Sequence, residues 1–141
     1  MNTLNGLKVI LTLLIVTLVL TACAAPRASA TPRVFFAEPA DGASVSGPVR
    51  VKMGAENFTV EPAGEVKAGA GHLHIMVDAD CMPAGQIVHK DDNHLHFGQG
   101  QTEAELALAP GAHRLCLQAA DGAHTALAGD GMTQIINITV K

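Results

Sequence analysis

The stretch Gly71-His72-Leu73-His74-Ile75-Met76-Val77-Asp78 decides the fold, because two kinds of side chain alternate along it. Leu73, Ile75 and Val77 occupy every second position, and histidines stand between them. Successive side chains of a strand point to opposite faces, so the pattern predicts a strand with an apolar inner face and an imidazole-bearing outer face. The stretch Asn93-His94-Leu95-His96-Phe97-Gly98 repeats the pattern and predicts a second such strand.

Short strands are predicted on both sides of this pair. Residues 34–36, 49–56 and 132–140 alternate or are rich in apolar β-branched and aromatic side chains, and turn signals separate them. The segments 102–109 and 112–119 flank Pro110-Gly111 and predict a β-hairpin. With about six to eight strands and no convincing amphipathic helix, we expect an all-β fold, an antiparallel immunoglobulin-like β-sandwich over residues 34–141.

The first 22 residues have the features of an export signal. Lys8 is their one charged side chain, an apolar run from Val9 to Leu20 follows, and small residues precede Cys23. The run is too short for a membrane span of about 20 residues. It is typical of a secretory signal peptide, here over residues 1–22.

Leu20-Thr21-Ala22-Cys23 resembles the bacterial lipobox. That resemblance implies cleavage before Cys23 and acylation of its sulfur by a palmitate-type chain, usually with a further chain on the new amino terminus. Two or three acyl chains suffice to hold a protein on a membrane. We therefore expect a lipoprotein with a lipidated tether over residues 23–33, anchored on the extracytoplasmic side of a bacterial membrane.

Composition excludes some partners. After removal of residues 1–22 the chain keeps 8 basic and 13 acidic side chains, a net charge of −5 with neutral histidines. An acidic surface without a basic stripe argues against nucleic acid. The absence of Trp and Tyr, with only 4 Phe, leaves few stacking surfaces for bases or sugars.

The histidines carry the main functional signal. All 7 fall between His72 and His124, and neutral imidazole is the commonest metal ligand in proteins. Two His-x-His pairs on neighbouring strands could present four nitrogens to one ion, which suits copper or zinc. The sequence therefore predicts a metal site, with these candidate ligands: His72, His74, His94, His96, His113 and His124.

A second interpretation needs no ion. Histidines close to Asp78, Asp91 or Asp92 could form a structural hydrogen-bond network in a non-catalytic interaction module of the cell envelope. Catalysis has less support, because no Gly-x-Ser-x-Gly, P-loop or His-Glu-x-x-His motif occurs and no nucleophile stands out. A His-Asp acid/base site is the remaining catalytic alternative.

Cys81 and Cys116 are the cysteines that remain after lipidation of Cys23. In an oxidising compartment an even pair is more often a disulfide than a metal site. A bridge closing a loop of roughly thirty-odd residues would stabilise the fold by about 3 to 4 kcal/mol in the chain-entropy model. Cu(I) binding or redox chemistry of the two thiols is the alternative.

The motifs together resemble a known family. The segments Gly71-His72-Leu73-His74, His94 to Glu103, Pro110 to His113 and Asp121 to His124 are similar to an uncharacterised bacterial exported family, domain of unknown function 4399. The resemblance covers about Pro39 to the C-terminus. It implies an exported β-rich domain and suggests that the six candidate histidines belong to one site, without supplying an activity.

A weaker resemblance concerns the start of the domain. Glu38 to Ala43 is similar to the opening of bacterial immunoglobulin-like modules and of small periplasmic copper-resistance sandwich domains. It supports the expected fold more than it supports a particular metal. The function expected from the sequence is that of a membrane-anchored envelope lipoprotein with a histidine-rich site for copper or zinc.

Overall fold

The structure is a computed structural model that describes residues 30–141. The predicted signal peptide, the lipidation of Cys23 and the greater part of the tether lie outside the described residues. Within residues 30–141 no helix is long and apolar enough to cross a membrane.

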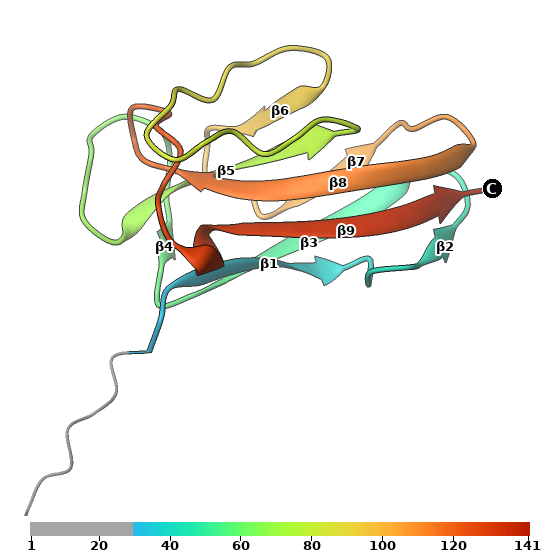
Figure 1. Cartoon of the computed structure of the whole chain (residues 1–141), viewed down its shortest axis with the longest axis horizontal. Coiled ribbons are helices and arrows are strands. Elements are labelled where there is room, and N and C mark those ends of the chain that lie inside the picture. Colours follow the sequence, from blue (N-terminus) through green and yellow to red (C-terminus); the bar gives the residue numbers. More distant parts are fainter. Residues whose placement is uncertain (1–29) are drawn as a thin grey trace, which may run out of the picture.

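Two sheets face each other across one core (Figure 1). The smaller sheet has the strand order β1-β3-β7, formed by Arg33–Glu38, Val49–Glu56 and Glu103–Leu106. The larger sheet has the order β2-β9-β8-β5-β4, formed by Ser44–Val45, Thr133–Val140, Gly111–Ala120, Ala70–Val77 and Thr59–Val60. Strand β6 (His94–Phe97) pairs with β5 as well, and a short 3₁₀ turn, η1 (Asp130–Met132), precedes β9.

This arrangement confirms the predicted antiparallel β-sandwich. The long neighbours pair antiparallel, and the parallel pairs are the two-residue strands β2 with β9 and β4 with β5. The first strands of the domain divide between the sheets, β1 and β3 in one and β2 at the edge of the other, as in immunoglobulin-like sandwiches.

The core forms where the inward faces of the two sheets meet. The alternation of apolar residues predicted these faces, and the prediction is confirmed in both sheets. One cluster buries the inward side chains of Val34, Phe36, Val49, Val51, Met53, Leu73, Ile75, Leu115, Leu117, Ile136, Ile138 and Val140. Each fully buried aliphatic side chain contributes about 1.5–3 kcal/mol relative to exposure. Burial of this row of side chains therefore fixes the register of every long strand.

The hairpin predicted around Pro110-Gly111 is wrong. Residues 103–106 form β7, which pairs with β3 in the smaller sheet, whereas β8 pairs with β5 and β9 in the larger sheet. The chain therefore crosses from one sheet to the other at this turn. A Pro-Gly turn between two strands is compatible with both connections, and burial of Leu106 in the core is what selects the crossing.

The prediction that the histidine-bearing face of β5 is an outer surface is also wrong. All eight residues of β5 are buried, on both faces. Strand β5 lies between β8 and β6, and the segment 79–93 covers the face that bears the histidines. That segment pairs with the loop 121–126 through backbone hydrogen bonds from Gly85 to Ala126, Val88 to His124 and Ala126 to Gln86.

Candidate metal centre

Two imidazoles of the site come from β5. His72 lies opposite Ala120 of β8, and His74 lies opposite Gln118 of β8 and His96 of β6. Because they are two residues apart on one strand, they share a face, with Leu73 pointing to the core between them. His72 is 0% exposed and His74 is 1% exposed.

The third imidazole comes from β6 and depends on a glycine. His96 and Gly98 are two residues apart, and a Cβ at Gly98 would overlap Cε1 and Nε2 of His96. The missing side chain thus leaves the space that the His96 ring occupies. The motif His-x-His-x-Gly carries this signal in the sequence, although Gly98 was not among the predicted site residues.

The fourth imidazole is His124, in the loop 121–126. The Asp121 side chain shapes this loop by accepting hydrogen bonds from the backbone N–H groups of Ala123 and Thr125, at 2.9 and 2.8 Å. His124 has φ +67°, the left-handed region that side chains other than glycine rarely adopt. Non-glycine residues held in this region concentrate at functional sites, because the surrounding structure must maintain the strained backbone.

The four rings converge on one point. Nε2 of His72 lies 3.0 Å from Nε2 of His74 and 3.0 Å from Nδ1 of His124. His96 stacks on His74 with ring centroids 5.0 Å apart and contacts His124 edge-on at 4.8 Å. One nitrogen from each ring lies within 4.8 Å of the others, so the group could hold a metal ion.

Hydrogen bonds satisfy only part of the group. The contacts at Nε2 of His72 join three of the rings, with the donor set by the tautomers. Nδ1 of His72, Nδ1 of His74 and Nε2 of His96 are buried without a hydrogen-bond partner. Buried polar atoms in proteins are usually paired, so a purely structural network of these rings is incomplete.

Burial favours the neutral form of three of the four rings. Burial, followed by the mutual repulsion of the imidazolium forms, lowers the pKa of His72 to about 4 and that of His74 to about 3. Burial also lowers the pKa of His96, with the charges of His124 and Lys90 acting in the same direction. Neutral imidazoles keep a nitrogen lone pair, the form that binds metals.

Two of the six predicted ligands lie elsewhere. The structure does not bring His94 and His113 to the group formed by His72, His74, His96 and His124. His94 donates from Nδ1 to Asp91 at 2.8 Å and lies on the opposite face of β6 from Leu95. Since His94 and His96 share one strand face, the distance along the strand and the pairing with Asp91 separate their rings.

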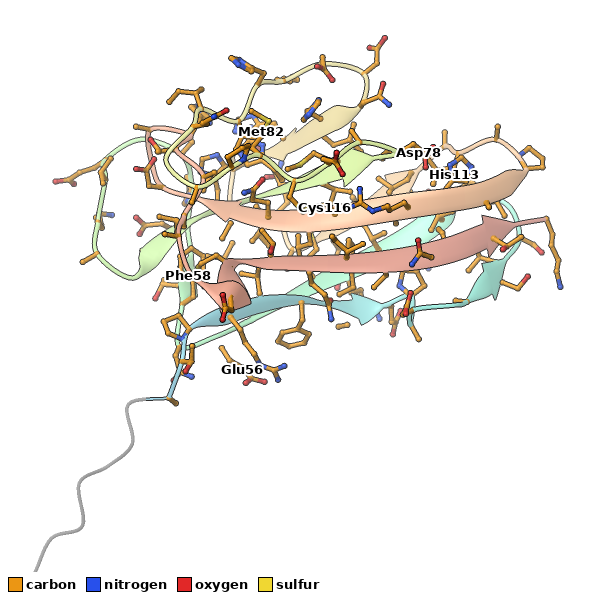
Figure 2. All side chains as sticks on the ribbon, in the orientation of Figure 1. Glu56, Phe58, Asp78, Met82, His113 and Cys116 are labelled. Atoms are coloured by element: carbon orange, nitrogen blue, oxygen red, sulfur yellow. A yellow bond between two sulfur atoms is a disulfide. The ribbon has the colours of Figure 1, made fainter. Side chains whose placement is uncertain are left out.

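His113 has a structural setting of its own. It lies beside Asp78, toward the opposite end of β8 from the loop that carries Met82 (Figure 2). Its Nδ1 donates to Oδ2 of Asp78 at 2.7 Å and its Nε2 donates to the carbonyl of Ala109 at 2.8 Å. Because both partners only accept, they favour the doubly protonated ring, and the pKa of His113 is raised by the Ala109 carbonyl and by Asp78.

The segment 79–93 is fastened over the site. The predicted disulfide between Cys81 and Cys116 is confirmed, with Cα atoms 5.7 Å apart, and it ties the segment to β8. The side chain of Gln118 accepts from the N–H of Met82 at 2.9 Å and donates to its carbonyl at 2.8 Å. Figure 2 shows Met82 on this loop above the strand that carries Cys116. The role of buried Gln118 had no signal in the sequence beyond its place two residues after the cysteine.

A pocket of about 230 Å³ adjoins three of the four rings. It is lined by His74, Ile87, Val88, Lys90, His96 and His124. Ile87 is 48% exposed, so the pocket opens at the molecular surface between the two loops. The site is therefore reachable from solvent although two of its rings are fully buried.

Comparisons with known proteins give one family and one distant structure. The family model described as "Domain of unknown function (DUF4399)" matches residues 51–141. No curated protein sequence matches the chain significantly. The X-ray structure of the endo-beta-1,4-mannanase from Thermotoga petrophila is similar over 79% of this chain at 17% identity and a TM-score of 0.44. The chain spans 20% of that structure, and a likeness this low carries no argument about this protein.

Proposed function

This chain belongs to the DUF4399 family, as its motifs indicated, and on that premise we propose that it binds one copper or zinc ion through His72, His74, His96 and His124. The observation that carries the proposal is the convergence of four imidazoles whose nitrogens lie within 4.8 Å of one another. Four nitrogens at this spacing need only small shifts to reach ligand distances of about 2.0–2.1 Å from a common centre.

The choice of ion follows from the donors. Imidazole nitrogen suits zinc and copper, and neither a carboxylate nor a thiolate belongs to the group. Cys81 and Cys116 are joined in a disulfide and offer no thiolate. Copper(II) has the higher intrinsic affinity for nitrogen sites, so selection between the two ions in the cell depends on which is available.

The experiment compares histidines inside and outside the group. The full chain, purified in a mild detergent, is dialysed against Cu(II) or Zn(II), and bound metal is measured together with thermal stability. We expect about one ion per chain, and a stabilisation of about 2.7 kcal/mol when free metal is 100 times its Kd. His96→Gln and His124→Gln should lose the ion, whereas the matched variants His89→Gln and His94→Gln should retain it.

The rival function is that of an interaction module with a structural histidine network. It is favoured by the hydrogen bonds that join His72 to His74 and to His124. On that reading the wild type retains no ion, and His96→Gln and His124→Gln change only stability. Retention of the ion by both of these variants would likewise refute the proposed ligands.

We further propose that the protein is held in the bacterial cell envelope by acyl chains on Cys23. The support is the sequence Leu20-Thr21-Ala22-Cys23 behind an apolar run. In cells fed a labelled fatty acid, the wild type should carry label and sediment with membranes, and Cys23→Ser should do neither. An unlabelled wild type in the soluble fraction would contradict the anchor.

A further inference from the structure

The four imidazoles are not placed equally around the pocket. His74, His96 and His124 line it, whereas His72 does not and is 0% exposed. His72 nevertheless lies at the centre of the contacts, since its Nε2 is 3.0 Å from nitrogens of two other rings. An ion held by all four rings would thus have His72 behind it and the pocket in front.

This asymmetry matters for any further ligand of the ion. Four imidazoles fill the tetrahedral shell of a zinc ion, whereas Cu(II) prefers a tetragonal arrangement of nitrogen donors and can take one more ligand on its open side. Here the side toward solvent is bordered by Ile87 and Val88, which offer no ligand atoms, and not by a fifth donor. The open position would therefore be filled from solution.

The charge near the pocket is positive. Lys90 lines it and forms no ion pair with any residue in the described range 30–141. Lys90 lines the same pocket as His74, His96 and His124, so its charge lies close to the rings. A bound divalent ion would add to this charge, and both favour a negatively charged occupant.

The size of the pocket limits that occupant. A volume of about 230 Å³ is below the range of roughly 300–1,000 Å³ that is typical of drug-sized ligands. A cavity of about 150 Å³ already holds a benzene-sized molecule, so this pocket admits small anions and small organic acids but not a drug-sized ligand. A small anion is the simplest occupant of this class.

Resting on the metal centre proposed above, we propose that the pocket admits a small monovalent anion, which binds the metal ion as an exchangeable ligand with Lys90 as its counter-charge. The His72 side of the ion is closed, so exchange occurs through the opening beside Ile87. The protein thereby presents a metal ion that can react with small solutes, and does more than store it.

The test uses azide as the probe anion on the full chain loaded with one equivalent of Cu(II). Titration should produce a saturable azide-to-copper charge-transfer band and a changed electron paramagnetic resonance spectrum. Lys90→Met should weaken azide binding about two- to fivefold, the range expected for a solvent-exposed charge. The matched variant Lys67→Met, whose lysine lies outside the pocket and pairs with Glu61, should bind azide as the wild type does.

A second variant tests the opening. Ile87 is 48% exposed, so Ile87→Trp can fold normally while its indole narrows the pocket. We expect unchanged nitrogen-coordinated copper and slower or weaker azide binding. Azide affinity and rate equal to wild type in both Ile87→Trp and Lys90→Met would overturn the pocket as the anion site.

The outcomes separate this inference from the metal centre itself. If the wild type holds copper with imidazole-nitrogen hyperfine coupling and azide leaves the spectra unchanged, the anion proposal is wrong and the metal centre stands. If copper is not retained, or is retained equally by His96→Gln, the metal centre is wrong and the anion proposal falls with it.

Discussion

At the scale of single residues, Gly98 shows how the site depends on an absent side chain. The His96 ring occupies the volume where a Cβ at position 98 would stand. A methyl group there must displace either the ring or strand β6. Since β6 is held to β5 by its pairing with Leu73 to Met76, the ring is the part that can move.

We therefore expect Gly98→Ala to weaken metal binding roughly tenfold or more, the effect typical of losing ligand orientation. The measurement is metal affinity by competition with a chelator. In a His96→Ala background, which is expected to lose the ion, the comparison uses the free energy of unfolding of the metal-free protein, and Gly98→Ala should lower it less than in the wild type because the ring it displaces is already gone. Equal losses in both backgrounds would show that Gly98 acts on the fold and not on His96.

His113 is the second case at this scale, and its contribution depends on pH. Its folded pKa is raised above the ordinary 6.5 by the carbonyl of Ala109 and by Asp78, and the pKa of Asp78 is lowered from 3.8, first by the N–H of Arg114. The raised pKa of His113 stabilises the fold fully below about pH 6.5, and this stabilisation is lost as pH rises through the folded pKa. The lowered pKa of Asp78 stabilises the fold above about pH 4, and this stabilisation is lost as pH falls through the folded pKa.

Both contributions are therefore present between about pH 4 and 6.5. We expect the free energy of unfolding lost in His113→Gln to be largest near pH 5, about 1 kcal/mol after screening of the partly exposed carboxylate, and smaller at pH 8. Urea unfolding of both proteins at the two pH values measures it. His89→Gln is the control, and a loss that does not depend on pH would rule out the imidazolium.

At the scale of elements, the segment 79–93 acts as a cover that is fastened at several points. The disulfide from Cys81 to Cys116, the two hydrogen bonds of Gln118 to Met82, and the backbone pairing of residues 85–88 with 124–126 all hold it. The same pairing fixes His124, because its carbonyl accepts from the N–H of Val88 at 2.8 Å. The cover thus positions one of the four rings.

Removal of the disulfide in a Cys81→Ala, Cys116→Ala variant should lower the free energy of unfolding by about 3 to 4 kcal/mol. Because the cover also positions His124, metal affinity should fall too. Chemical denaturation and chelator competition measure the two effects. Hydrogen exchange at the Val88 amide should be faster in the variant than in the wild type, and this increase should exceed any increase in the core strand β9. Unchanged exchange at Val88 would contradict the role of the disulfide in holding the cover.

At the scale of the whole molecule, the fold brings together four imidazoles from three separate segments of the chain. The folded pKa values of His72 and His74, about 4 and about 3, lie below the ordinary 6.5. The unfolded chain therefore binds more protons than the folded chain between about pH 6.5 and pH 4. Protonation favours unfolding across that window.

For the metal-free protein in chelator, we expect the free energy of unfolding to decrease as pH falls from about 6.5 to 4, by up to about 1.4 kcal/mol per pH unit for each of the two histidines. Denaturation at a series of pH values measures the slope. A His72→Gln variant should show a shallower slope. A stability that rises over this range would mean that the rings are charged in the fold.

The all-β sandwich and the inner face of each long strand could be predicted from the sequence. The period of two in segments such as 49–56, 71–77 and 132–140 leaves one apolar face per strand, and two such faces must meet to be buried. The pairing of Cys81 with Cys116 was predictable because an export signal was expected, and the two cysteines other than Cys23 have one way to join.

Part of the site followed from the same alternation, since His72 and His74 had to share a face and a partner strand could place His96 beside them. Local sequence could not choose between His113 and His124, which both follow a glycine and an alanine. That choice depends on which loop folds over the outer face of β5. Local sequence also could not reveal that Pro110-Gly111 joins two sheets, because burial of Leu106 in the core decides this connection.

The sequence alone determined the periodicity of the strands, because alternation depends on geometry within one strand. The fold class and the shared face of each histidine pair follow from that periodicity. Only the tertiary structure decided that the histidine face is covered, that His124 completes the group, and that His94 and His113 pair with Asp91 and Asp78 instead. The physical reason is that these outcomes depend on contacts between segments far apart in the chain, whose energies no local pattern encodes.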